Sequence, residues 1–182
     1  MKVISGKYKG RTLAGYDMTG TRPTMDRVKE SLFAIIQQKV KSSIVLDLFS
    51  GTGNLGIEAL SEGANAAYLV DKNKKAYETI KKNIKTLNIE NAYLYCLDYK
   101  EALKKLHEEE KQFDIIFLDP PYKTDYIEKS IEGIEKYQLL KEDGIIICES
   151  DDMNKIIYSD HFEIVKSKKY GDKFIAILKE IW

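Results

Sequence analysis

A chain of 182 residues, 43% of them hydrophobic and with no net charge, is long enough for one domain with a buried core. No run is apolar for long enough to cross a bilayer, and the polar start excludes a secretory signal, so we expect a cytoplasmic protein without membrane contact. Cys96 and Cys148, like the two histidines, are isolated, which predicts buried thiols and no metal site.

The charge is unevenly distributed along the chain. Residues 1–43 carry nine lysines and arginines against three acidic residues, a net +6 that the remaining 139 residues balance. We expect residues 1–43 to form a basic extension of a hairpin and a helix, and residues 44–182 to form the main domain. A basic end favours an anionic partner, although a solvated charged face has the same composition.

The basic extension contains two predicted elements. Lys2–Ser5 and Lys9–Leu13 predict a short β-hairpin around a turn at Gly6. Apolar residues at helical spacing between positions 26 and 40 predict a helix, with Thr24 as its N-cap.

From Ser43 onward, strand-like and helical runs alternate, which is typical of a doubly wound α/β sheet. The predicted strands are Ile44–Phe49, Ala66–Asp71, Ala92–Leu97, Phe113–Asp119 and Gly144–Ser150. The predicted helices are Asn54–Gly63, Lys74–Leu87, Tyr99–Glu109 and Asp125–Leu140. Two final runs, Phe162–Lys169 and Lys173–Lys179, predict a terminal hairpin that adds at least one antiparallel strand.

A G-x-G-x-x-G sequence at residues 51–56 follows a predicted strand and opens a predicted helix. Glycines at these positions let the backbone approach a ligand closely and let the helix pack on the strand. Asp71 ends the next strand, twenty positions after Gly51, where a carboxylate can hold the hydroxyls of a ribose. Alone, this pattern fits a nicotinamide-dependent dehydrogenase nearly as well as a methyltransferase.

Four aspartates, Asp47, Asp71, Asp98 and Asp119, lie at or just after the ends of successive predicted strands. The carboxyl ends of parallel strands meet at one edge of the sheet, so we expect the four side chains to surround one crevice. A negative field there suits a ligand with a sulfonium and an ammonium group, and it opposes a pyrophosphate. The alternative is that each aspartate only caps a turn.

Asp119-Pro120-Pro121-Tyr122 directly follows a buried strand. The two prolines stop the strand and stiffen the loop, because each fixes φ and removes a donor. An entering amino group would find the Asp119 carboxylate and the Pro120 carbonyl as acceptors, and Tyr122 would offer a face on which a base can stack. Positioning of a poorly nucleophilic exocyclic amine in this way favours N-methylation over an ordinary turn.

Residues 47–56, the Val70-Asp71-Lys72 sequence and the Asp119–Tyr122 box resemble the bacterial 16S rRNA guanine-N2 methyltransferases of the RsmD type. The resemblance extends over nearly the whole chain and includes 4–6, 9–11, 22–30 and 170–172. The box is shared with many amino-methyltransferases, whereas the N-terminal segments are specific to the family.

The resemblance implies a Rossmann-like class I S-adenosylmethionine-dependent methyltransferase fold, with a seven-stranded, mostly parallel sheet and a C-terminal antiparallel hairpin. It implies that Asp71 binds the cofactor's ribose, that Asp47 and the glycine loop face its methionine part, and that Asp98 lies near its adenine. The box, with Asp119, Pro120, Pro121 and Tyr122, would hold the flipped base. The cofactor-binding set implied by position is Asp47, Phe49, Gly51, Gly53, Asn54, Asp71, Lys72, Asp98 and Thr24.

The implied partner is 16S rRNA in the small ribosomal subunit or in its assembly intermediate, bound by a monomer. Phosphate contacts in the basic extension would fix the register of the RNA without reading its sequence. The residues expected to make them are Lys7, Lys9, Arg11, Arg22 and Arg27.

Three alternatives stay open. A DNA adenine-N6 or cytosine-N4 methyltransferase shares the chemistry, but this chain leaves little room for a sequence-reading domain. A protein glutamine methyltransferase commonly has asparagine in place of Asp119. A nicotinamide-dependent dehydrogenase shares the glycine loop.

Overall fold

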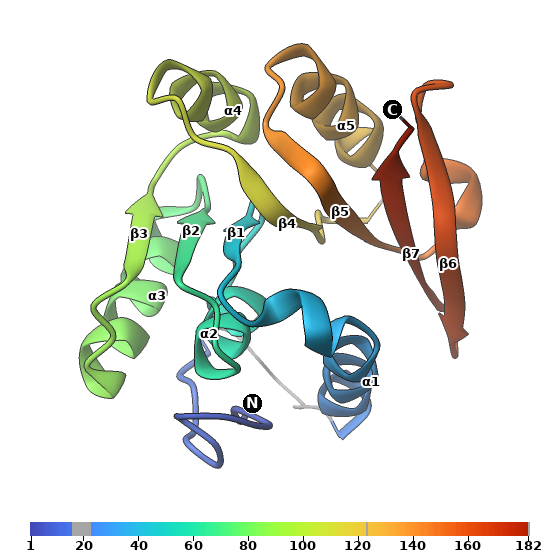
Figure 1. Cartoon of the computed structure of the whole chain (residues 1–182). Helices are drawn as coiled ribbons and strands as arrows, with labels where there is room; N and C mark the ends of the chain where they lie inside the picture. The colour runs from blue at the N-terminus through green and yellow to red at the C-terminus, as the bar shows by residue number, and fades with distance from the viewer. Residues whose placement is uncertain (16–22, 123, 182) are drawn as a thin grey trace.

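The computed structural model describes residues 1–15, 23–122 and 124–181. The described part of the chain contains one seven-stranded sheet (Figure 1). The strand order is β3-β2-β1-β4-β5-β7-β6. β1 to β5 pair in parallel, whereas β7 is antiparallel to both β5 and β6. The strands are β1 (Ile44–Asp47), β2 (Ala66–Val70), β3 (Ala92–Tyr95), β4 (Phe113–Leu118), β5 (Leu140–Ser150), β6 (Phe162–Tyr170) and β7 (Lys173–Glu180). The predicted α/β sheet and its terminal antiparallel hairpin are confirmed.

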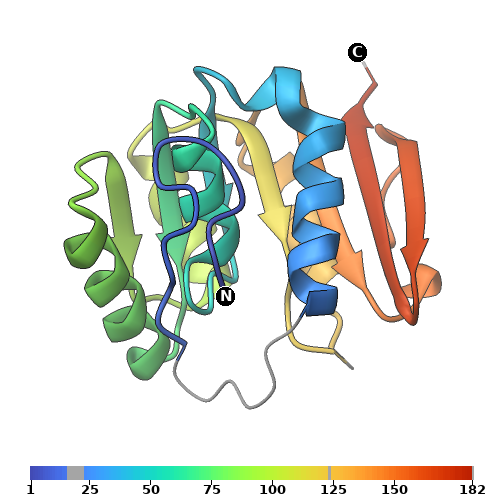
Figure 2. The same cartoon turned by 90° about the horizontal axis from the view of Figure 1, so that it is seen from below.

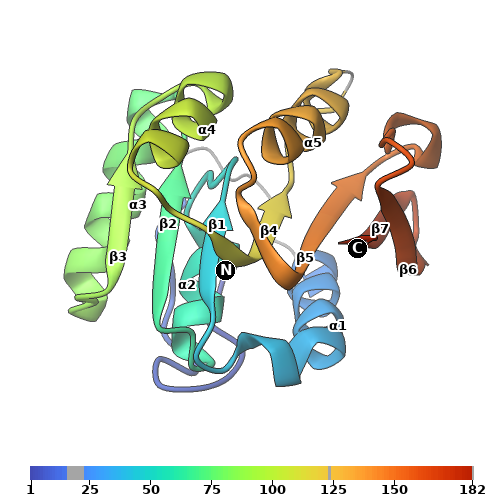
Figure 3. The same ribbon diagram turned by 45° about the horizontal axis from the view of Figure 1, so that its top comes forward.

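Helices cover both faces of the sheet (Figure 1 and Figure 3). One face carries α1 (Pro23–Val40), α2 (Asn54–Ser61) and α3 (Lys74–Leu87). The opposite face carries α4 (Tyr99–Glu108) and α5 (Tyr126–Lys136). A short 3-10 helix, Met153–Lys155, follows β5.

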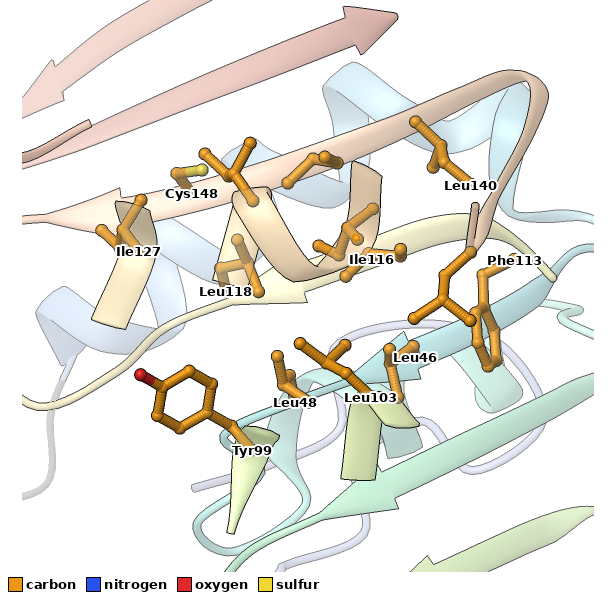
Figure 4. Packing of buried hydrophobic residues seen from close by; sticks show 14 of the residues in the cluster. Leu46, Leu48, Tyr99, Leu103, Phe113, Ile116, Leu118, Ile127, Leu140 and Cys148 are labelled. Carbon is orange, nitrogen blue, oxygen red and sulfur yellow. The ribbon is translucent and has the colours of Figure 1, made fainter. Parts of the chain in front are cut away.

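The sheet separates two hydrophobic cores. Successive residues of a strand point to opposite faces, so Leu46 and Ile116 pack under α4 and α5, while Val45 and Ile115 pack under α1 to α3. All four are fully buried, as expected for central parallel strands. Figure 4 shows the first of these cores, with Phe113 at one end of β4.

The N-terminal segment lies along α2 (Figure 2). Its turn lies near the amino ends of the parallel strands, whereas α1 begins near their carboxyl ends. The arms of the predicted hairpin do pair antiparallel, at a bridge from Lys2 to Thr12 and through the amides of Val3 and Leu13, which donate to the carbonyls of Arg11 and Met1, but the pairing is too short to form named strands. The Lys7 amide donates to the Ser61 carbonyl, and the Tyr8 amide donates to the Ser61 hydroxyl. The turn of the hairpin is thus attached to the end of α2.

A buried ion pair ties this segment to α1 and α2. Lys29 Nζ lies 3.0 Å from Glu58 Oε1, and the side chains are 1% and 0% exposed. Glu58 also accepts from the amides of Ile4 and Ser5, and Lys29 donates to the Asn54 side chain at 2.7 Å. Asn54 is the first residue of α2, so the pair also supports the start of the helix that follows the glycine loop.

Two smaller predictions are wrong. α1 begins at Pro23, so Thr24 lies in the first turn and is not the N-cap, since proline is favoured at the first helical position. Cys148 is buried but Cys96 is exposed, because Cys96 lies beyond the end of β3. Within the described residues, no helix combines the length and the apolarity needed to span a membrane.

Candidate active site

The strand order reverses between β1 and β4, and ligands of open α/β sheets bind at such a point, outside the carboxyl ends of the strands. Asp47 is the last residue of β1, and Asp71 and Asp119 directly follow β2 and β4. Asp98 precedes α4 and caps it, with its carboxylate accepting from the Lys100 amide. The structure thus brings the four predicted aspartates to one edge of the sheet.

Two adjoining cavities lie at this edge, and both are lined by Phe49, Gly51 and Asp119. The larger one, of about 370 Å³, is also lined by Asp71 and Asp98. The smaller one, of about 200 Å³, extends in the other direction, and its further lining residues include Asp47, Asn54, Leu32, Glu149 and Lys173. One elongated ligand can therefore occupy the larger cavity and extend past Gly51 toward Asp47, while a second molecule approaches Asp119 from the side of Glu149 and Lys173.

The glycine loop shapes the boundary between the cavities. Gly51 and Gly53 have φ angles of +57° and +85°, which glycine adopts without strain. At Gly56, a Cβ atom would lie 2.1 Å from Leu69 Cδ2, so α2 packs directly on β2. The Gly51 amide donates to Asp71 Oδ2 at 2.9 Å, which fixes the carboxylate toward the larger cavity.

Asp47 is a buried carboxyl group at the floor of the smaller cavity. Its Oδ2 accepts from the Gly56 amide at 3.2 Å, whereas its Oδ1 accepts no hydrogen bond from the described residues. Burial raises the pKa of Asp47 to about 7, and the nearby carboxylate of Asp71 adds to the shift. A buried acceptor without a partner at a cavity is suited to a ligand that brings a cation.

Three aromatic rings form an apolar wall at the larger cavity. The Phe49 ring lies 5.4 Å from the Tyr99 ring and is stacked on the Tyr126 ring at 5.9 Å, between centroids. All three line the cavity, with Asp98 beside them. Tyr99 and Tyr126 were not predicted from the sequence, although each is the first residue of a helix that follows a strand ending at the site.

Asp119, the first residue of the Asp119–Tyr122 box, lies where the two cavities meet, and Pro120 and Pro121 line the larger one. Pro120 is buried, whereas Tyr122 is 45% exposed and lines neither cavity. Burial raises the pKa of Asp119 well above its usual range, and the neighbouring carboxylate of Glu149 raises it further, against the lowering effect of Lys173. Lys173 Nζ lies 2.7 Å from Glu149 Oε1 and 5.8 Å from the centre of the Tyr122 ring.

The remaining predicted residues do not all reach the cavities. Lys72 is exposed and lines the larger cavity, and the Asn54 amide oxygen is occupied by Lys29. Arg22 and the side chain of Thr24 lie outside the described part of the chain.

The predicted phosphate-binding residues occupy two places. Lys7, Lys9 and Arg11 are exposed. The Lys7 amide contacts Ser61, the last residue of α2, and the Arg11 side chain contacts the Thr86 carbonyl near the end of α3, so this group lies far from the glycine loop. Arg27 is exposed in the first turns of α1, near the smaller cavity that Met25 and Val28 help to line.

Over nearly its full length, the sequence matches proteins that belong to one family. A family described as "Conserved hypothetical protein 95" matches residues 1–179. The putative rRNA methyltransferase YlbH of Bacillus subtilis is 46% identical over 182 residues, 99% of either chain. Ribosomal RNA small subunit methyltransferase D of Buchnera aphidicola (subsp. Acyrthosiphon pisum) is 37% identical over 166 residues, 91% of this chain and 86% of that protein. The chain belongs to this family.

The structure agrees with membership of the methyltransferase D family. The putative methyltransferase yhhF of Escherichia coli superimposes with a TM-score of 0.87 at 28% identity, over 99% of this chain and 97% of that one. SMU.776, a putative methyltransferase complexed with SAH, shares the fold, with a TM-score of 0.71 at 20% identity over 88% of this chain and 50% of that one. The RsmD-type resemblance and the Rossmann-like class I fold predicted from the sequence are confirmed.

Proposed function

We propose that this protein transfers a methyl group from S-adenosylmethionine to the exocyclic N2 amino group of a guanine in 16S rRNA of the small ribosomal subunit. As a member of the methyltransferase D family, it is an S-adenosylmethionine-dependent rRNA methyltransferase. The choice of guanine as the base and of N2 as the methylated atom goes beyond family membership and is part of our proposal. The observation that carries it is Asp119, held at the meeting point of a cofactor-sized cavity and a second cavity open to a substrate.

The residues at the larger cavity fit the cofactor. Asp71 has both oxygens oriented by backbone amides, of Gly51 and Asn73, and faces the position expected for the ribose hydroxyls. The aromatic wall of Phe49, Tyr99 and Tyr126 offers a flat surface to an adenine ring. The unpartnered Oδ1 of Asp47, in the adjoining smaller cavity, suits the ammonium of a methionine part that extends past Gly51 into that cavity. The acidic lining opposes the pyrophosphate of a nicotinamide cofactor.

The cofactor, when bound, supplies an electrophilic methyl carbon. The protein's part is to orient the amine: the Asp119 carboxylate and the Pro120 carbonyl accept its two hydrogens, which turns the nitrogen lone pair toward that carbon. Partial burial of Asp119 strengthens these hydrogen bonds. After transfer the nitrogen carries one proton too many, and Asp119 or water takes it. We assign stacking on the base to the exposed Tyr122, which lies beside Lys173.

Cofactor affinity should increase with pH, because burial raises the pKa of Asp47 to about 7. Below that pH Asp47 is protonated in the free protein and cannot pair with an ammonium, so the binding of S-adenosylhomocysteine must first release the proton. We expect its affinity to fall about tenfold from pH 8 to pH 6. Calorimetry on the wild type and on Asp47→Asn measures this; the variant should bind weakly with no such slope. A flat wild-type profile would remove Asp47 from the ammonium site.

Two cationic surfaces can hold the RNA backbone. The first contains Lys7, Lys9 and Arg11, which lie away from the cavities. The second, missed by the sequence analysis, is the exposed end of β6 with Lys168 and Lys169, next to the turn that leads to Lys173 in the cavity wall. We expect phosphates near the methylated base to lie on the second surface, and more distant ones on the first.

Lys168→Ala with Lys169→Ala should weaken rRNA binding more than Lys9→Ala with Arg11→Ala, because the β6 lysines lie closer to the cavities. Each pair should reduce the slope of log affinity against log salt by about 1 to 2, one unit for each lost phosphate contact. Filter binding over a salt series measures both effects. A slope identical to that of the wild type would remove the corresponding surface from the RNA interface.

A methyl-transfer assay tests the proposed function. Labelled S-adenosylmethionine is offered with free 16S rRNA, with small subunits from cells that lack the enzyme, and with duplex DNA. We expect label in one or both rRNA substrates and none in DNA. Label in DNA alone would favour the adenine-N6 or cytosine-N4 alternative. Calorimetry with S-adenosylhomocysteine and NADH separates the remaining alternative, since tight NADH binding would favour a dehydrogenase.

A further inference from the structure

We propose that Glu149 and Lys173 recognise the base: Glu149 accepts the N1 proton of guanine and Lys173 donates to its O6, beside the amino group held by Asp119. The inference rests on the proposed function and assigns a specificity role to two residues that the methyl-transfer chemistry does not use.

The three side chains come from neighbouring strands. β4, β5 and β7 are adjacent in the sheet, and Leu118 pairs with Cys148, so Asp119 and Glu149 are the next residues along each strand. Glu149 pairs with Ile175 on β7, and Lys173 lies two residues from Ile175, on the same face of that strand. Asp119, Glu149 and Lys173 therefore form a row across the sheet edge, and all three line the smaller cavity.

The order of this row matches one edge of guanine. The row presents an acceptor, a second acceptor and a donor. Guanine presents its N2 amino group, its N1–H and its O6 carbonyl in the same order, as donor, donor and acceptor. In adenine and in cytosine, the ring nitrogen beside the amino group is an acceptor, and its lone pair would face the Glu149 carboxylate. Such an unpaired, repulsive contact in a buried site rejects the wrong base.

Lys173 keeps hydrogen-bonding capacity for a ligand, whereas Glu149 contacts the Asp119 carboxyl group as well as Lys173, so a base must replace the first of these contacts. The Lys173 ammonium has three donors and gives one to Glu149 Oε1. The Lys173 side chain is 25% exposed and the Glu149 side chain is 13% exposed, so the pair is partly buried but accessible from the cavity. The carboxylates of Glu149 and Asp119 outweigh the effect of burial and raise the pKa of Lys173, which therefore stays a donor. Tyr122, whose ring centre lies 5.8 Å from Lys173 Nζ, is exposed beside the row.

Base analogues separate recognition from structural support. The shortest rRNA fragment or reconstituted particle that the wild type methylates is prepared with guanine, 2-aminopurine or 2,6-diaminopurine at the mapped position. Both analogues keep the 2-amino group but replace the N1–H by an acceptor and remove O6. We expect the wild type to prefer guanine by about 100-fold or more in kcat/KM. In Glu149→Gln and in Lys173→Met this preference should fall to about tenfold or less.

Lys179→Met is the matched control, because Lys179 is a paired lysine near the other end of β7 and lies outside the two cavities. It should keep the full preference. If the Glu149 and Lys173 variants slow all three substrates equally and keep the preference, the pair is structural and the inference is wrong. If one variant fails to fold, the other decides, with S-adenosylhomocysteine affinity as the check on folding. A wild type that never methylates guanine N2 would instead refute the proposed function.

Discussion

Asp119→Ala should reduce kcat for methyl transfer by about 10³-fold, a loss comparable to removal of one essential electrostatic contact in other enzymes. The side chain lies where the cavities meet and is the only carboxylate placed by the proposal on the reacting amine. Cofactor affinity should change little, because the ribose and ammonium contacts are assigned to Asp71 and Asp47. Single-turnover kinetics and calorimetry with S-adenosylhomocysteine measure the two effects separately.

The pH dependence of the methyl-transfer rate provides a second test of the role of Asp119. Burial raises its pKa, and the ionised form is the better acceptor, so the rate should increase as the pH rises through that pKa. Asp119→Asn keeps an oxygen acceptor and should retain some activity without this dependence. Equal losses of turnover and of cofactor affinity in Asp119→Ala would mean that the residue serves the fold.

Glu58→Gln should lower the free energy of unfolding by about 3 to 5 kcal/mol, because it removes the carboxylate that lies 3.0 Å from the buried Lys29 ammonium. The same change weakens the acceptor for the amides of Ile4 and Ser5. Urea denaturation followed by circular dichroism measures the loss. The N-terminal segment should become accessible to proteases at the same time.

A surface pair provides the control for this prediction. Lys129 and Glu132 on α5 are 41% and 59% exposed, and Glu132→Gln should cost less than about 0.5 kcal/mol. Combining Glu58→Gln with Lys29→Met should recover part of the stability, since no charge then remains buried. A loss below about 1 kcal/mol in Glu58→Gln would show that water or the chain itself compensates the charge of Lys29.

The order of elements and the strand ends were predictable because they depend on local patterns. The apolar run at Phe113–Leu118 and the alternation of strands with helices identify a buried parallel sheet without any knowledge of contacts. Aspartates at strand ends then locate the crevice, since topology alone brings them together. The rule was applied to Asp47, Asp71, Asp98 and Asp119 but not to Glu149, the penultimate residue of β5.

The residues that sequence reasoning missed depend on long-range pairing. Lys173 reaches the site only because β7 inserts between β5 and β6, an order that the hairpin pattern does not specify. The amides of Ile4 and Ser5 find their acceptor in Glu58, more than fifty residues away, so the local pattern predicts the hairpin but not its attachment to α2. Tyr99 and Tyr126 become one wall only because α4 and α5 cover the same face.

The most direct test of the proposed guanine-N2 methylation is nucleoside analysis of 16S rRNA from cells with and without this gene. We predict that the deletion strain lacks one N2-methylguanosine, that the gene restores it, and that the Asp119→Ala variant does not. Mass spectrometry of nuclease fragments would also locate the modified guanine. A deletion strain whose N2-methylguanosine content is unchanged, or one that instead loses a methylated adenine or cytosine, would contradict the proposal.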